Sequence, residues 1–127
     1  MKLAAKPMAD ALVAWWREAA EMMCAGRFEE LADKFGYGVR YDREAVAAIQ
    51  EDVAACLRAV GESRLVLPSS SEVPKVTFYV PNDSHLVASV DGILMGKPEV
   101  FMGFSLVVFG EGGVYYVTLE SIDASAA

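Results

Sequence analysis

The residue with the greatest catalytic potential in this sequence is its single histidine, His85. An imidazole titrates near neutral pH, so His85 could act as a general base if a pocket held it beside Asp91 or Tyr116. The neighbouring Asp83 and Ser84 supply the other residue types of a nucleophilic triad. Adjacent residues in a turn cannot form the chain of hydrogen bonds that a triad needs. We therefore interpret this segment as a turn, and the alternative, catalytic interpretation rests on His85, Asp91 and Tyr116.

Sequence motifs for metal ions and nucleotides are missing. The sequence has neither a His-Glu-x-x-His nor a Cys-x-x-Cys motif, and its two cysteines are far apart. Gly36-Tyr37-Gly38 lacks the third glycine of a dinucleotide-binding loop, and no phosphate-binding Gly-Lys-Ser/Thr sequence occurs. Cys24 and Cys56 fall in helical apolar patterns, where a free thiol behaves as a small hydrophobic side chain. The sequence therefore predicts no metal site, no cofactor and a reducing, cytoplasmic location.

Acidic side chains are the strongest remaining signal. The chain has 18 acidic and 11 basic residues and a formal charge of −7, which disfavours binding to nucleic acids or anionic membranes. A basic protein is the natural electrostatic partner. Turn acids often serve only solubility, but here they could form a negative rim that steers such a partner. The predicted rim residues are Asp83, Asp91, Glu99 and Glu111. Successive hairpin turns alternate between the two ends of a sheet. We therefore expect Asp83 and Glu111 to lie at one end and Asp91 and Glu99 to lie at the other.

Three helices are expected in the first half of the chain, because apolar residues recur there at three- and four-residue steps. Pro7 suits the first turn of the first helix, and Gly26 suits the left-handed position after its end. Asp42 is the predicted N-cap of the third helix, and Gly61 is its stop. The expected helices cover residues 8–25, 27–35 and 43–60.

Strands are expected after residue 61, where the hydrophobic period changes from 3.6 to 2. The pattern predicts an antiparallel meander of about four strands over residues 75–122. Its turns are expected at residues 81–84, at 91–92 or over the longer segment 91–96, and at 110–113. The strand at residues 99–109 is apolar on both faces, so one face can pack on the helices. Burial by the same molecule, a pocket, a protein ligand or a homodimer partner could cover the other.

The sequence therefore predicts one α+β domain over residues 1–127, with a helical half at 8–61 and a strand half at 64–122. Residues 123–127 are expected to form a frayed tail. Charged residues such as Asp10 and Arg17 interrupt any signal-peptide core. The longest uncharged run, Val100 to Gly110, is too short to cross a membrane as a helix.

The order of helices followed by a meander resembles the NTF2-like cone fold. The local resemblance lies in Ala25-Gly26-Arg27-Phe28-Glu29-Glu30-Leu31, which joins the first two expected helices. NTF2-like proteins include small-molecule isomerases and dehydratases, non-catalytic ligand binders, and immunity proteins that block bacterial toxins. The resemblance implies that an enzymatic member would carry polar acid and base groups within the cone, where this chain offers only His85, its tyrosines and a few acids.

We predict a non-enzymatic protein-binding domain, specifically an acidic immunity or antitoxin-type protein that occludes a basic toxin. The alternative is an NTF2-like enzyme or small-ligand-binding protein with a pocket between helices and sheet. A deep pocket with His85 or Asp91 pointing inward would favour the alternative. A shallow, acidic surface would favour protein binding.

Overall fold

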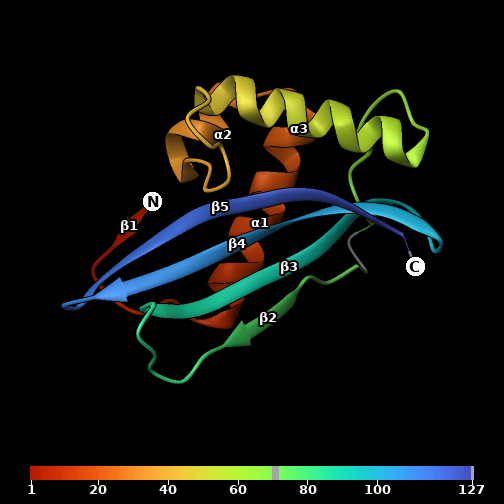
Figure 1. Cartoon of the computed structure of the whole chain (residues 1–127). Coiled ribbons are helices and arrows are strands. Elements are labelled where there is room, and N and C mark those ends of the chain that lie inside the picture. The colour runs from red at the N-terminus through yellow and green to blue at the C-terminus, as the bar shows by residue number, and fades with distance from the viewer. Residues whose placement is uncertain (70–71, 127) are drawn as a thin grey trace.

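Three helices and one five-stranded antiparallel sheet make up the computed structural model, which describes residues 1–69 and 72–126 (Figure 1). The helices are α1 (Ala9–Cys24), α2 (Phe28–Phe35) and α3 (Ala45–Val60). The strands are β1 (Lys2–Leu3), β2 (Lys75–Phe78), β3 (Leu86–Lys97), β4 (Val100–Glu111) and β5 (Val114–Ala126), in the spatial order β1-β5-β4-β3-β2. The predicted α+β class, with helices before the main strands, is confirmed.

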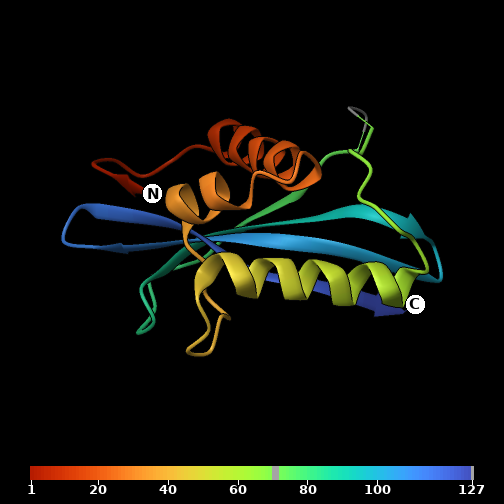
Figure 2. The same ribbon diagram turned by 90° about the horizontal axis from the view of Figure 1, so that it is seen from above.

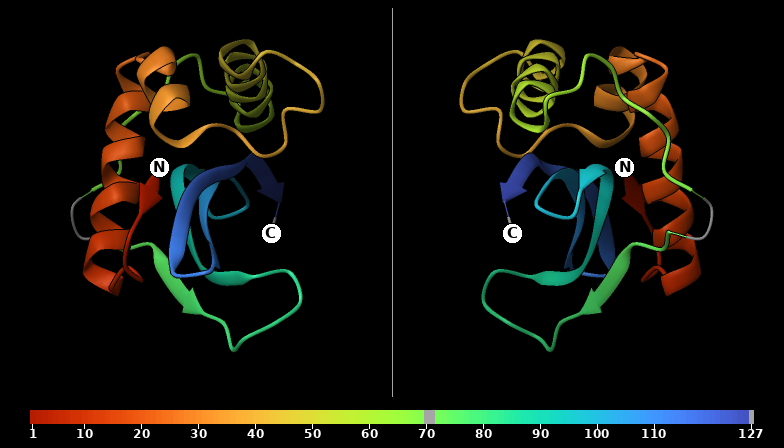
Figure 3. Two further views of the ribbon diagram at one scale, coloured as in Figure 1. Left: turned by 90° about the vertical axis from the view of Figure 1, so that its left-hand side faces the viewer. Right: turned by 90° about the vertical axis from the view of Figure 1, so that its right-hand side faces the viewer.

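The helices cover one face of the sheet, which we call the inner face. α1 contacts β2 and β3, whereas α3 lies against β4 and β5. The two helices run in different directions, and the sheet curves beneath them (Figures 2 and 3). The opposite, outer face of the sheet has no helix over it in the described part of the chain. Three long strands, β3 to β5, form the centre of both faces.

The alternation of side chains along β4 separates the two faces. Met102, Phe104, Leu106 and Val108 point to the helices and are at most 3% exposed. Trp16 of α1 stacks on Phe104, with ring centroids 4.5 Å apart, and its indole N–H donates to the Phe104 carbonyl oxygen at 3.0 Å. One aromatic side chain thus joins the helical layer to the sheet by both packing and a buried hydrogen bond.

Residues 91–92 do not form a turn, contrary to the sequence-based prediction. β3 continues from Leu86 to Lys97, and the chain reverses only after that. Gly92 lies beneath Trp16, and a Cβ atom there would overlap the indole ring. The glycine therefore serves close packing between helix and sheet, which local sequence patterns do not distinguish from a turn. Register shifts after Ile93 in β3 and opposite Ser105 in β5 bend the sheet at this point.

The predicted N-cap of the third helix is also wrong. The Glu44 carboxylate, not that of Asp42, accepts hydrogen bonds from the backbone N–H groups of Val46 and Ala47, at 3.0 and 2.9 Å. Asp42 has a left-handed backbone with φ of 65° and lies too early to reach the first turn. Gly61 ends the helix as predicted, in a left-handed conformation, and Gly26 after α1 has the predicted left-handed backbone.

The ends of the chain are more ordered than expected. β1 near the N-terminus pairs with β5, an element that the sequence did not predict. Residues 123–126 continue β5 in register with β4 and do not form the expected frayed tail. Residues 70–71 and 127 lie outside the described residues. The turn at Gly112–Gly113, where both φ angles are positive, closes the predicted hairpin between β4 and β5. Among the described helices, none is sufficiently long and apolar to cross a membrane.

Candidate functional site

The structure separates the four predicted rim residues. Asp83 lies in the loop between β2 and β3, and Glu111 ends β4, so both are at the same end of the sheet. Glu99 lies in the β3–β4 turn at the opposite end. Asp91 lies within β3, six residues before the end of that strand at Lys97, which corresponds to about 20 Å of strand. Asp83 and Glu111 therefore lie at the same end of the sheet, as expected. Asp91 and Glu99 do not share an end.

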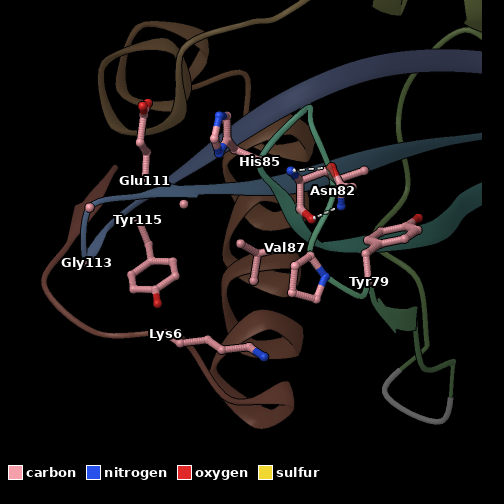
Figure 4. Close-up of a pocket in the computed structure, with 12 residues that line it drawn as sticks. Lys6, Tyr79, Asn82, His85, Val87, Glu111, Gly113 and Tyr115 are labelled. Carbon is pink, nitrogen blue, oxygen red and sulfur yellow. Dashed lines mark hydrogen bonds between the residues drawn. The ribbon is translucent and has the colours of Figure 1, made fainter.

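A cleft of about 310 Å³ lies at the Asp83–Glu111 end (Figure 4). The Tyr115 ring and Val87 close over Gly110, where a Cβ atom would meet both side chains at 2.7 and 2.9 Å. Lys6 lies across the cleft from His85 and Glu111. This end of the sheet is thus not uniformly acidic, because a lysine from the N-terminal segment lies among the acids.

The cleft holds His85, but not the rest of the alternative catalytic set. His85 has φ of 58°; its N–H donates to the Asn82 carbonyl, and its own carbonyl accepts from Gly110 N–H at 2.9 Å. Its side chain is exposed at the surface. Tyr116 is half exposed and pairs with Phe109, and Asp91 is six residues further along β3. The structure does not bring His85, Asp91 and Tyr116 together, so no proton relay joins them.

The space between helices and sheet is filled by side chains. Trp16, Leu12, Met23, Met102 and Leu106 are each at most 1% exposed there. Neither His85 nor Asp91 points into this layer, since His85 is in a loop and Asp91 is on the outer face. The predicted acid and base groups His85 and Asp91 therefore lie outside the interior of the described structure.

The outer face carries apolar and aromatic side chains on neighbouring strands. Phe101, Val107 and Phe109 alternate with the inner-face residues of β4; Phe101 and Phe109 are partly exposed, whereas Val107 is buried. Ile93 on β3 is 49% exposed and Tyr116 on β5 is 46% exposed. The predicted two-sided apolar character of this strand is thus present in the structure, and one of its sides faces outward.

A polar network crosses the same face. The Ser105 hydroxyl donates to Asp91 Oδ1 at 2.5 Å, and the Ser89 hydroxyl donates to Oδ2 at 3.2 Å. The Tyr79 hydroxyl lies 3.0 Å from that of Ser89. Asp91 is nevertheless exposed, so its carboxylate is held in one orientation while both oxygens remain open to further donors. A depression of about 380 Å³ adjoins it, whose lining includes Lys75, Ile93, Phe101, Ser105 and Asp123.

A cluster of ionisable groups with shifted pKa values lies elsewhere, between the α2–α3 loop and α3. Arg43 donates to both carboxylate oxygens of Asp52, and Tyr37 donates to one of them at 2.5 Å. Burial raises the pKa of Asp52, but hydrogen bonds from Arg43 and Tyr37 outweigh it, so the pKa lies below its ordinary value. Burial, followed by the Asp52 hydrogen bond, raises the pKa of Tyr37. This cluster fixes the loop between α2 and α3 against α3.

Neither the thiols nor the acids form a reactive or metal-binding centre. Burial, with the charges of Asp123 and Asp52, raises the pKa of Cys56 to about 11, so its thiol is protonated at neutral pH. Both cysteines are free. Within residues 1–69 and 72–126, no group of three His, Cys, Asp or Glu residues is placed to hold a metal ion.

Sequence reasoning missed Lys6, Ser105 and Asp123 as lining residues. Lys6 reaches the cleft only because β1 pairs with β5, a contact far apart in sequence. Asp123 was assigned to a tail, although it is opposite Gly103 in the sheet. Comparison of the chain with protein-family models, with characterised proteins and with solved structures finds no match.

Proposed function

We propose that this chain is a non-enzymatic domain that binds a basic protein through the outer face of its sheet. The observation that carries the proposal is an apolar and aromatic outer face over which the described chain places no helix. Ile93 on β3 and Tyr116 on β5 are exposed there, and Phe101 and Phe109 of β4 between them are partly exposed. Exposed apolar patches of this kind are typical of protein interaction sites.

The filled interior supports binding over catalysis. A small-molecule enzyme of the alternative kind would need a pocket between helices and sheet, lined by acid and base groups. Here Trp16 and its neighbours occupy that layer, and His85 and Asp91 lie outside it. The shallow surface on the outer face fits a protein partner better than an enclosed substrate.

Charge supports a basic partner. The chain has a net charge of −7, and the outer face carries Asp91 and Asp123 against Lys75. Opposite charges on two proteins accelerate their encounter and select the partner. The most specific form of the proposal is an immunity-type protein, of the kind found among NTF2-like folds, that covers a basic toxin. A toxin-like reading frame next to the gene would support this form.

Site-specific photo-cross-linking tests the proposal. A photoreactive phenylalanine analogue replaces Ile93 on the outer face or, as a matched control, Gln50, which is exposed on α3. In cells that naturally make the protein, we expect an adduct from position 93 only, containing a second protein with a basic isoelectric point by mass spectrometry. Ile93→Asp should abolish co-purification of that protein.

Other adducts would contradict the proposal. An adduct of two copies of this chain from position 93 would instead identify the outer face as a homodimer interface, and equal adducts from both positions would indicate no specific surface. For the immunity-type form, the identified partner expressed alone should slow growth. Co-expression of this chain, but not of its Ile93→Asp variant, should restore it.

A further inference from the structure

The depression on the outer face is created by a glycine in the middle of β4. Gly103 pairs with Ile93 on β3 and with Asp123 on β5, and it places no side chain between them. A Cβ atom at this position would overlap the carbonyl oxygen of Gly92. Since the close approach of the two backbones requires glycine, the depression of about 380 Å³ is a fixed feature of the fold.

Two carboxylates stand on opposite sides of the depression. Asp91 belongs to β3 and Asp123 to β5, so the two strands are separated by β4 and lie about 10 Å apart. Ser89 and Ser105 hold the Asp91 carboxylate in place, and each of its oxygens can accept one more hydrogen bond. Lys75 is opposite Asp91 on β2. The local balance is two negative charges against one positive charge.

The remaining wall is apolar and aromatic. Phe101 and Ile93 line the depression beside the acids. A ligand that fits must combine a positive charge and hydrogen-bond donors with a flat surface that can lie on an aromatic ring. A guanidinium group has these properties: it donates two parallel hydrogen bonds to a carboxylate and stacks on aromatic faces. An ammonium group is a compact, strongly hydrated charge and lacks the flat surface.

We infer that the depression above Gly103 is the anchor site for an arginine side chain of the basic protein partner. The guanidinium donates to Asp91, lies against Phe101, and receives longer-range attraction from Asp123. This inference rests on the proposed function, and it names the residue type by which the partner is recognised. A second copy of this chain fits less well, because it would bring the same carboxylates and a charge of −7 to the interface.

Titration with a model compound tests the anchor site without a partner. N-acetyl-arginine amide is added to the whole protein labelled with nitrogen-15, and backbone amide shifts are followed by NMR. We expect saturable shifts at Ile93, Gly103 and Ser105. N-acetyl-citrulline amide, which is nearly the same shape without the charge, should leave these shifts unchanged at the same concentrations.

Matched variants identify the groups that bind. Asp91→Asn should weaken binding of the arginine compound about five-fold, and Phe101→Leu about two- to three-fold. Lys75→Ala should tighten it about two-fold, since it removes a like charge. Asp10→Asn removes an exposed acid from α1 and should have no effect. Shifts spread over all acidic surfaces, equal shifts with citrulline, or unchanged affinity in Asp91→Asn would each overturn the inference.

The experiments distinguish a failure of the anchor site from a failure of the proposed function. A basic partner cross-linked from position 93 together with no specific arginine shifts would leave the proposed function standing and remove the anchor site. Specific arginine shifts without any basic partner would leave the anchor site as a property of the surface and remove the proposed function.

Discussion

The two faces of the sheet are built from the same three strands, yet they have opposite relations to the rest of the molecule. Phe104 and Leu106 on the inner face are at most 3% exposed beneath the helices, whereas Ile93 on the outer face is 49% exposed. The inner face therefore contributes most of the hydrophobic stabilisation. The outer face contains comparable apolar residues that folding leaves partly in contact with water. This difference indicates that residues of similar chemistry stabilise the fold on one side and remain partly exposed on the other.

The largest expected effect is on the inner face, at Trp16. Trp16→Ala removes the stacking on Phe104 and the hydrogen bond to its carbonyl, and it leaves a cavity. We expect a loss of about 3 to 5 kcal/mol in the free energy of unfolding, measured in urea. Trp15→Ala is the matched control, because Trp15 is only partly buried. Equal losses for the two variants would contradict the central role of Trp16.

A substitution on the outer face should also destabilise the fold if it is made at Gly103. Gly103→Ala adds a methyl group near the outer face, but this group would overlap the Gly92 carbonyl of the neighbouring strand. The backbone must shift, so we expect a loss of about 2 kcal/mol by the same measurement. Ser125→Ala, at an exposed position that lines the same depression, should change stability by less than about 0.5 kcal/mol. A negligible effect of Gly103→Ala would mean that the strands can separate there.

A smaller loss in the free energy of unfolding is expected from a substitution at Asp52, which fixes the α2–α3 loop to α3. Asp52→Asn removes the negative charge that accepts hydrogen bonds from Arg43 and Tyr37. The lowered pKa of Asp52 means that its contribution is fully present above about pH 4, the ordinary value, and disappears as pH falls through the folded-state pKa. We expect Asp52→Asn to cost about 1 kcal/mol at pH 7.

The pH dependence separates this effect from general damage. Unfolding curves of the wild-type protein and Asp52→Asn should converge in acid, because both then carry a neutral side chain. Glu51→Gln, whose carboxylate also contacts Arg43 at 3.2 Å but is 62% exposed, should have a smaller effect. A difference that persists unchanged in acid would contradict the ionic origin of the stabilisation.

The smallest effect on stability is expected at the predicted acidic rim. Replacing Asp83 and Glu111 together by lysine should alter the free energy of unfolding by less than about 0.5 kcal/mol, because exposed loop charges contribute little. Association with the proposed basic partner should be slower and less dependent on salt. Stopped-flow measurements at low and moderate ionic strength check the association rate and its salt dependence. A variant with Asp91 and Glu99 replaced by lysine is measured for comparison. Unchanged rates for both pairs would remove the acidic rim and leave the apolar outer face as the binding surface.

The sequence predicted the three helices and the antiparallel strands after them, but not β1, because the evidence for the predicted elements is local. Apolar periodicity located three helices to within two residues at each end, and Gly26 and Gly61 marked two of their ends. The N-cap was displaced from Asp42 to Glu44, since both acids precede the helix and only the backbone geometry decides which one reaches it. The Asp91–Gly92 turn was wrong because a glycine required for packing leaves the same local pattern as a glycine required for a turn.

The sequence by itself determined the fold class, the net charge and the presence of one strand that is apolar on both faces. These properties depend on composition and on residue spacing, which the chain carries before it folds. Only the tertiary structure decided which face the helices cover, and that Lys6, His85 and Glu111 share a cleft while Asp91 and Asp123 flank Gly103. These arrangements depend on strand pairing between distant segments, such as β1 with β5. No local pattern fixes such pairings, because their energy comes from contacts that exist only after the chain has closed on itself.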